Sequence, residues 1–395
     1  MRRNMRVLLT PLLLILLSTP CLAARALVPG GQVVGMQLSA EGVVVAGFSE
    51  DFESAAEAAG VQTGDVIVKV NGAAVDNLET LKDALQQGPE AALTIRREDE
   101  TIELTVPLKK SDGAWRLGAL VRQGVSGLGT ISYYDPKTGV FGALGHGVGD
   151  GKSRMLLPIR EGSLVQASVT GVERGTAGAP GALQGCFDAE KTLGVIEENT
   201  AHGVYGRLTE AIPGDSFPTA DASELTLGPA VIRATVDEGG VREYAVQILR
   251  TDLSEEADGR NLLLEVTDPA LLERTGGIVQ GMSGSPILQN GKLIGAVTHV
   301  LVGDPTKGYG IFIENMLAAG ETPPPALLSQ APFSVSDKPK TSREPGSLLS
   351  DSNRFAGLES VYDEPVIARR RKAPTRQAVP LMASPGGEAV SRQAD

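Results

Sequence analysis

Short runs of alternating apolar residues, broken by glycine or proline, occupy most of the chain from Trp115 to about Gly310. A period of two is typical of strands, and the frequent turn residues indicate many short strands with little helix. Glycine accounts for 48 of the 395 residues, while aromatic residues make up only 4%. This composition favours tight turns and close backbone packing over large helical cores. We therefore predict a mainly β fold, with a barrel or sandwich in this region.

The charge and the few metal-binding side chains exclude several functions. The formal net charge is −12, which argues against nucleic-acid binding, because that requires clustered cations. Two Cys and three His leave little room for a zinc cluster or a disulfide framework, and we expect no metal or organic cofactor. Cys186 has no sequence context of a catalytic thiol, so we expect a small buried residue there.

The two ends of the chain differ from its middle. Residues 1–26 contain four Arg, no acidic residue and an apolar run, as in a secretory signal. The same run would reach roughly 27 Å as a helix, so cleavage and retention as a membrane anchor both stay open. In either case the rest of the chain is exported. Residues 321–395 contain ten of the 24 Pro, which predicts a disordered tail.

Residues 65–110 contain a strand, a turn and a helix in close succession. The run 65–70 alternates and is β-branched, and Asn71-Gly72 supplies the two positive-φ positions of a type I′ hairpin turn. Asp76 and Glu79 fit the N-cap and N3 positions of a capping box. Leucines continue the helix at helical spacing: Leu78, Leu81 and Leu85.

The stretch 54–72 resembles bacterial PDZ domains, and we assign this domain to residues 27–110. The resemblance implies that the backbone amides of Val34, Gly35 and Met36 bind a peptide carboxylate. The segment from about Met36 would pair with a peptide strand, and the helix from Asn77 would form the other wall of the groove.

A serine flanked by glycines lies in the run 277–287, Gly-Ile-Val-Gln-Gly-Met-Ser-Gly-Ser-Pro-Ile. Such glycines hold a hydroxyl on a tight turn and leave backbone N–H groups facing a reacting carbonyl. We expect the N–H groups of Gly281 and Ser283 to form an oxyanion hole. The position between two glycines favours Ser283 over Ser285 as the nucleophile of a chymotrypsin-like serine peptidase.

A serine nucleophile requires a base, and neutral imidazole is the usual one. The chain offers His146, His202 and His299. His146 follows an apolar run and has glycine on both sides, which leaves room for a substrate. His202 has no such setting, whereas His299 lies on the predicted strand 292–300, where we expect it to line the substrate site.

The third member of a serine triad is an acid that orients the imidazole. Spacing does not decide among four aspartates: Asp150, Asp252, Asp268 and Asp304. Asp268 also fits the N-cap of a helix, since Pro269 follows it at the first helical position.

The chain is very similar to the stage IV sporulation protein B (SpoIVB) peptidase family in four segments: 127–137, 142–147, 266–286 and 295–300. The order of signal or anchor, PDZ domain and peptidase domain also matches. The resemblance implies a chymotrypsin-like β-barrel peptidase domain at 111–320. It further implies His146 as base, Asp268 as orienting acid and Ser283 as nucleophile.

This family implies a sporulation signalling protease. Its members are exported into the space between forespore and mother cell and cleave themselves near the N-terminus. They then cut a membrane-bound regulator of an intramembrane protease, which activates a late sigma factor. The expected partners are a peptide or protein substrate at the PDZ groove and active site, a membrane-bound regulatory complex and the protein itself. The tail after Gly320 departs from the family pattern.

Two other functions stay open at this point. The chain would be a non-catalytic peptide-binding adaptor if the Gly-Ser loop were only structural. It would be an envelope quality-control protease of the HtrA kind if it degraded unfolded proteins. In that group the PDZ domain usually follows the protease domain, whereas here it precedes it.

Overall fold

The computed structural model describes part of the chain, in these ranges: 25–48, 54–97, 100–111, 113–149, 156–254, 257 and 259–321. The predicted signal or anchor, except for Arg25 and Ala26, and the predicted tail beyond Glu321 lie outside these residues, as does Asp150. Within them, no helix has both the length and the apolar character that a membrane crossing requires.

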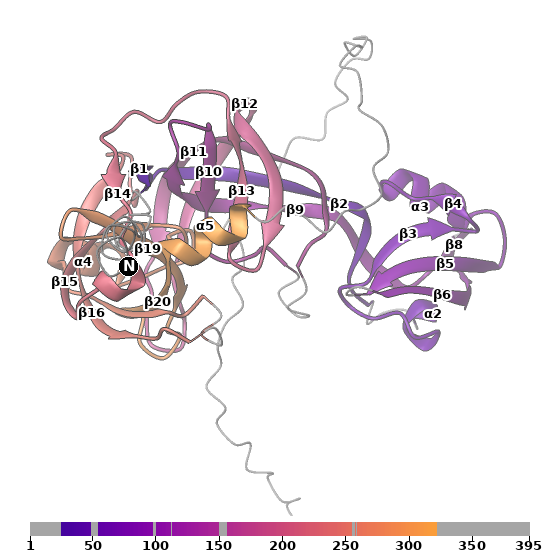
Figure 1. The fold of residues 1–395 in the computed structure, drawn as a ribbon. Helices are drawn as coiled ribbons and strands as arrows, with labels where there is room; N and C mark the ends of the chain where they lie inside the picture. The colour runs from indigo at the N-terminus through magenta and orange to yellow at the C-terminus, as the bar shows by residue number, and fades with distance from the viewer. Residues whose placement is uncertain are drawn as a thin grey trace, which may run out of the picture. The chain divides into compact units, whose positions relative to one another are not determined.

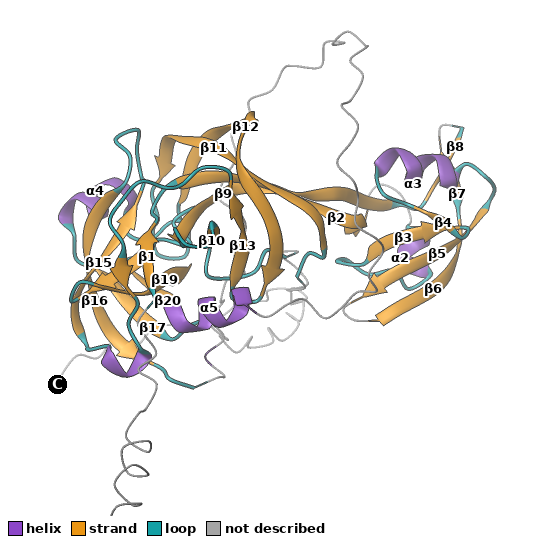
Figure 2. Cartoon of the chain, turned by 45° about the horizontal axis from the view of Figure 1, so that its top comes forward, coloured by secondary structure: helices purple, strands orange, loops and turns teal. Residues whose placement is uncertain are grey.

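Strands dominate the described residues (Figures 1 and 2). The strands of the first half are β1 (Ala26–Pro29), β2 (Val33–Phe48), β3 (Val66–Val70), β4 (Ala73–Ala74), β5 (Glu90–Arg97), β6 (Glu100–Pro107), β7 (Lys109–Ser111), β8 (Ala114–Arg116), β9 (Ala119–Tyr134) and β10 (Val140–Ala143). Those of the second half are β11 (Ile159–Glu173), β12 (Ala182–Thr200), β13 (Gly203–Leu208), β14 (Phe217–Pro218), β15 (Gly228–Ala234), β16 (Arg242–Thr251), β17 (Leu262–Val266), β18 (Pro286–Gln289), β19 (Lys292–Val300) and β20 (Lys307–Phe312). The helices are α2 (Ala55–Ala58), α3 (Leu78–Leu85), η1 (Ala222–Glu224), α4 (Pro269–Thr275) and α5 (Ile313–Glu321).

The PDZ-like region contains β3 to β6 with α2 and α3. The predicted hairpin turn is confirmed, because Asn71 and Gly72 both have positive φ, 52° and 79°. The predicted capping box is present but one residue later than expected. Asn77 is the N-cap and accepts from Thr80 N, while the Thr80 hydroxyl accepts from Asn77 N. This shift leaves Leu78 at the first helical position and 42% exposed, while Leu81 and Leu85 are buried.

Two six-stranded antiparallel barrels contain most of the other strands. In the first, the strands pair in the order β9-β10-β13-β12-β11-β2, and β2 pairs again with β9, which closes the ring. The second is the closed barrel β15-β16-β17-β20-β19-β18. Each barrel has an apolar interior, with Phe141 and Leu164 in the first and Ile232 and Leu264 in the second. A pair of such barrels is the architecture of chymotrypsin-like peptidases, so the predicted fold class is confirmed.

The structure corrects the expected PDZ carboxylate loop. Val34, Gly35 and Met36 are buried within β2, where they pair with β11 on one side and β9 on the other. Their strand therefore has no free edge for a peptide. The glycine also serves packing, because a Cβ on Gly35 would lie 2.7 Å from the Phe187 side chain. These residues belong to the first barrel, and so does β1, through its pairing with β9.

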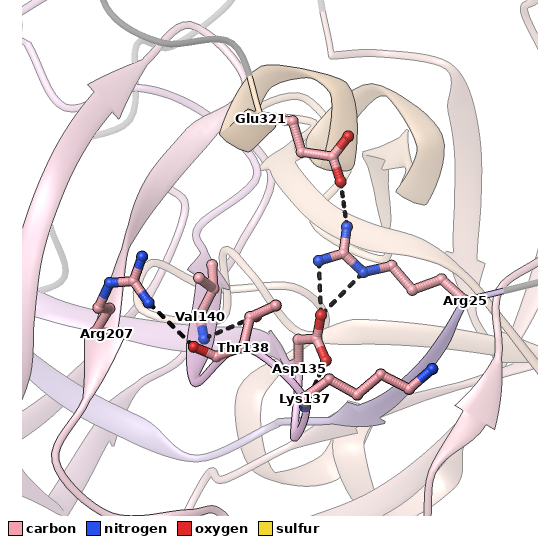
Figure 3. A network of polar contacts seen from close by, with 7 residues as sticks. All are labelled: Arg25, Asp135, Lys137, Thr138, Val140, Arg207 and Glu321. Carbon is pink, nitrogen blue, oxygen red and sulfur yellow. Dashed lines mark hydrogen bonds and ion pairs between the residues drawn. The ribbon is translucent and has the colours of Figure 1, made fainter.

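A polar network fixes the start of the described chain (Figure 3). The Arg25 guanidinium donates to Asp135 through Nε at 3.1 Å and Nη2 at 2.6 Å, and it also contacts Glu321 at the end of α5. Asp135 lies in the β9–β10 turn, where its carboxylate also accepts from Lys137 N. Arg25, directly before β1, is therefore anchored to the first barrel.

Candidate active site

The Ser283 loop connects α4 to β18 through two consecutive turns. Met282 N donates to Val279 O and Ser285 N donates to Met282 O, while Gly284 N donates to Val297 O. This pattern leaves the N–H groups of Gly281 and Ser283 without an acceptor among the described residues. Both can therefore face a substrate carbonyl, as an oxyanion hole requires.

Glycine is required next to the serine for a steric reason. Gly284 has a φ of 96°, and a Cβ there would lie 2.1 Å from Thr130 O and 2.6 Å from Leu144 N. The serine loop thus packs directly on β9 and on the turn that precedes His146. No other residue type fits this close approach of backbones.

The two serines of the loop differ in accessibility. Ser283 is half-buried, and its hydroxyl donates to Thr298 O at 2.7 Å. Ser285 is 0% exposed, and its hydroxyl has no hydrogen-bond partner in the part of the chain that the structure describes. The geometry therefore favours Ser283, the residue that the sequence also favours.

His146 follows β10 in a tight turn. Gly145 N donates to Ala143 O across Leu144, whose φ of 68° is unusual for a residue with a side chain. The ring nitrogen Nδ1 lies 2.9 Å from Gly147 O. Because a carbonyl only accepts, Nδ1 must carry the proton, and Nε2 keeps its lone pair. Nε2 is buried and has no partner among the described residues, so it is free to act as a base.

The histidine and serine loops touch, but their catalytic side chains are not hydrogen-bonded. A Cβ on Gly145 would lie 2.9 Å from the Thr298 side chain, and Leu144 abuts Gly284. The Ser283 hydroxyl nevertheless donates to Thr298 O, and not to His146. The hydroxyl must therefore turn away from this carbonyl before the imidazole can take its proton.

His299 is the second histidine at this site. Its ring centroid lies 5.1 Å from that of His146, and its backbone follows the carbonyl that binds Ser283. Burial, the neighbouring His146 and then Arg260 lower its pKa to about 3. Burial also lowers the pKa of His146, against a smaller opposing effect of its bond to Gly147. Both rings are therefore neutral at pH 7.

The structure does not bring Asp268 to His146. Its Oδ1 accepts from Ala270 N and Leu271 N at 3.0 Å each, and its Oδ2 accepts from Ala245 N. Asp268 is thus the N-cap of α4, as Pro269 at the first position suggested. Two other candidate acids also have partners away from the imidazole: Asp252 with Ser254, and Asp304 with Thr306 and Lys307.

Two residues that no sequence motif indicated hold these loops in place. Asn199, at the end of β12, accepts from Val148 N and donates to Val148 O and Leu157 O, which fixes the segment after His146. Thr130, on β9, contacts the serine loop. An amide in a polar turn and a hydroxyl in a strand look ordinary in a sequence, because only the fold brings them here.

Cys186 is not the buried residue that we expected. It is exposed on β12, and its sulfur lies 3.4 Å from the Ser168 hydroxyl. No group of His, Cys, Asp and Glu among the described residues is arranged to hold a metal ion.

A pocket of about 610 Å³ lies on the PDZ-like region, between α3 and the segment that leads into β9. The first residues of β9, 119–121, pair with β2, and within the described part of the chain no strand lies on their other edge. Apolar side chains are open to this pocket, including Leu78 at 42% and Leu120 at 56% exposure. Basic side chains, Lys82 and Arg116, also line it.

Two β-barrels, with a half-buried serine on a glycine loop beside a neutral histidine, define a serine peptidase of the chymotrypsin-like class. The sequence profile of the SpoIVB peptidase S55 family matches residues 113–317, which is more than half of the chain. This protein therefore belongs to the SpoIVB peptidase S55 family. A PDZ domain profile matches residues 51–97, so the PDZ domain precedes the peptidase domain as predicted.

Solved structures with some likeness to the chain include two crystal structures of the Rv3671c protease, the first of them from M. tuberculosis H37Rv. The first, an inactive serine-to-alanine mutant, has a TM-score of 0.30 and 12% identity, and the match covers 51% of this chain and 84% of that one. The second, also an inactive form, has a TM-score of 0.29 and 12% identity, with 50% and 85% covered. No curated protein sequence matches the chain.

Proposed function

We propose that this peptidase is an exported sporulation signalling protease, which cleaves itself and a membrane-bound regulator of an intramembrane protease. Family membership supports the serine peptidase chemistry, and the signalling role follows from what the resemblance implies. The observation that carries the chemistry is the contact of the two loops. This contact brings together the half-buried Ser283 hydroxyl, the N–H groups of Gly281 and Ser283, and the loop that carries His146.

The chemistry follows from the groups at the site. Ser283 Oγ leaves Thr298 O, gives its proton to His146 Nε2 and forms a bond to the carbonyl carbon of the peptide. The N–H groups of Gly281 and Ser283 stabilise the oxyanion. The imidazolium then gives the proton to the leaving amine, and the C–N bond breaks. Water then attacks the acyl carbon and gives a proton to His146 Nε2. The C–O bond to Ser283 breaks, and the imidazolium returns the proton to Ser283 Oγ.

Thr298 O suggests how a substrate promotes this change. The carbonyl is on β19, directly before His299, the residue that we expected to line the substrate site. A substrate N–H that binds Thr298 O would displace the Ser283 hydroxyl from it. The free hydroxyl could then reach His146, so that substrate binding and nucleophile release would be coupled.

We place the PDZ groove between α3 and the first residues of β9, and not at Val34–Met36. An extended peptide would add to residues 119–121 by strand pairing, with its apolar side chains against Leu78 and Leu120. Lys82 would favour an acidic group on the peptide. This groove would select the substrate or a segment of the protein itself for cleavage.

The central test is Ser283→Ala in the full chain. We expect loss of self-cleavage and of turnover by roughly 10⁶-fold, because the catalytic residues act as a unit. N-terminal sequencing of both variants distinguishes signal removal, which continues in the mutant, from autoprocessing, which stops. Ser285→Ala is the matched control and should keep its activity. Identical processing in wild type and Ser283→Ala would contradict the proposal.

Two further assays separate the other functions. A fluorophosphonate probe labels Ser283 in a peptidase and leaves a non-catalytic adaptor unlabelled. Degradation of unfolded casein to many fragments would instead indicate a quality-control protease. A single discrete cut in a substrate supports the signalling role.

A further inference from the structure

Thr130 contacts both loops of the active site, although the serine loop lies about 150 residues further along the sequence. It is on β9 and is 0% exposed. Its hydroxyl donates to Gly281 O at 2.7 Å, and its backbone N–H donates to Ser283 O at 3.1 Å. Its own carbonyl accepts from Leu144 N at 3.2 Å, in the turn that leads to His146.

These contacts fix the peptide groups around the nucleophile. Gly281 O belongs to the peptide before Met282, and Ser283 O belongs to the peptide after Ser283. The peptide between them carries the Ser283 N–H, which has no acceptor among the described residues. Thr130 holds both neighbouring peptides, and Ser285 N donates to Met282 O of the peptide between them, so the direction of this N–H is constrained from three points.

The hydroxyl of Thr130 has a role that strand packing does not explain. Valine has nearly the same shape and suits a buried strand equally well. A buried hydroxyl is costly unless it makes a hydrogen bond, and this one donates to the loop that needs precise placement. The loop has another attachment to the first barrel at Gln280, which bonds Gly181 and Leu183, so its general position does not depend on Thr130.

We propose that Thr130 is a positioning residue that preorganises the Ser283 N–H as an oxyanion donor, because it holds the peptides on both sides of it. The proposal rests on the proposed peptidase mechanism, and it adds a residue outside the expected triad. Preorganised donors stabilise the charge that develops in the transition state without having to move. Loss of the hydroxyl should therefore slow acylation and leave ground-state binding nearly unchanged.

The test compares Thr130→Val with Thr130→Ser in the full chain. We expect Thr130→Val to lower the rate constant for fluorophosphonate labelling of Ser283 by about 10–100-fold, a part of what the loss of a whole donor costs. The half-saturating probe concentration should change less than threefold. Thr130→Ser keeps the donor and should stay within about threefold of wild type. The pH dependence of labelling should keep its midpoint, because His146 is untouched.

Ser132→Ala is the matched control. Ser132 lies two positions further along β9 and is 1% exposed, and its hydroxyl has no partner in the described residues. Its removal should leave labelling unchanged. If Thr130→Val does not fold, Thr130→Cys takes its place, because a thiol has a similar size and is a weaker donor. Its labelling rate constant should fall and its half-saturating probe concentration should stay within threefold of wild type.

Three outcomes would overturn the proposal: labelling of Thr130→Val within twofold of wild type, equal losses in the Ser and Val variants, or an effect confined to probe binding. Failure of the proposed function looks different. In that case wild type itself is not labelled at Ser283, or Ser283→Ala keeps its activity.

Discussion

At the scale of single residues, the active site depends on histidines that stay neutral in a buried place. His146 Nδ1–H donates to Gly147 O, so a backbone carbonyl sets the tautomer in which Nε2 can act as a base. His299 packs beside it, and Arg260 contributes to its low pKa. A neutral neighbour does not repel the proton that His146 takes up during catalysis.

The pH dependence of Ser283 labelling follows from this burial. Only neutral His146 acts as a base, and burial lowers its pKa below the usual 6.5. We therefore expect the labelling rate to be constant near pH 7 and to fall at acid pH, with a midpoint below 6.5. His299 should not contribute above pH 4, since its pKa is about 3. Measurement of the rate from pH 4 to 9 checks this, and a midpoint above 7 would show that His146 is not the buried base described here.

At the scale of elements, α4 shows how one residue can fit two roles in a sequence. Asp268 begins the helix as its N-cap, and Gly276 ends it with a φ of 77°. The family resemblance implies a catalytic role for the same carboxylate, which here is bound to backbone N–H groups. A catalytic role would require His146 Nδ1 to donate to this carboxylate, whereas here it lies 2.9 Å from Gly147 O.

Asp268→Asn and Asp268→Ala separate these roles. Asparagine is as good an N-cap as aspartate, whereas alanine costs about 1 kcal/mol. We expect thermal unfolding of the Asn variant to match wild type and that of the Ala variant to occur at lower temperature. The labelling rate of the Asn variant then tests whether Asp268 orients His146, as the family resemblance implies. A loss of about 10⁴-fold at unchanged stability would show that the carboxylate orients the imidazole, as it does in serine triads.

At the scale of the whole molecule, residues near the N-terminus are part of the peptidase fold. Arg25 links the β9–β10 turn to α5 through Asp135 and Glu321 (Figure 3). β1 and the first part of β2 then pair with β9 of the first barrel. A cut made after β1 would therefore remove an element of the catalytic domain, so the self-cleavage that we propose should occur before Arg25.

Asp135→Asn tests this anchor through its pH dependence. Burial raises the pKa of Asp135, but the bonds from Arg25 and Lys137 N outweigh it and lower the pKa below 3.8. The charged form thus stabilises the fold above about pH 4, and this contribution is lost as the pH falls through the lowered pKa. We expect the variant to lose roughly 2–4 kcal/mol at pH 7, since Asp135 is buried and Arg25 only partly so.

Urea unfolding at pH 7 and pH 3 measures the difference, which should shrink at the lower pH. Glu224→Gln, which breaks the exposed pair with Lys292, is the control and should change little at either pH. An equal loss at both pH values would show that the substitution acts through packing and not through the charge.

The sequence by itself determined the local features and the chemical types. The alternating runs gave strands, Asn71-Gly72 gave a hairpin turn, and the glycines around Ser283 gave a tight loop, because each depends on a few neighbouring residues. The same local pattern misplaced the PDZ groove. An alternating segment such as 34–38 is a strand in either domain, and its sequence does not say which strands pair with it.

Only the tertiary structure decided which distant residues meet. Thr130, Thr298 and Asn199 came to the two loops because barrel closure fixed the register of β9, β12 and β19. The same closure gave Val34–Met36 two strand neighbours, whereas residues 119–121 of β9 have one strand neighbour within the described ranges. Backbone hydrogen bonds between strands join residues regardless of their separation in sequence, so no local pattern could have predicted these contacts.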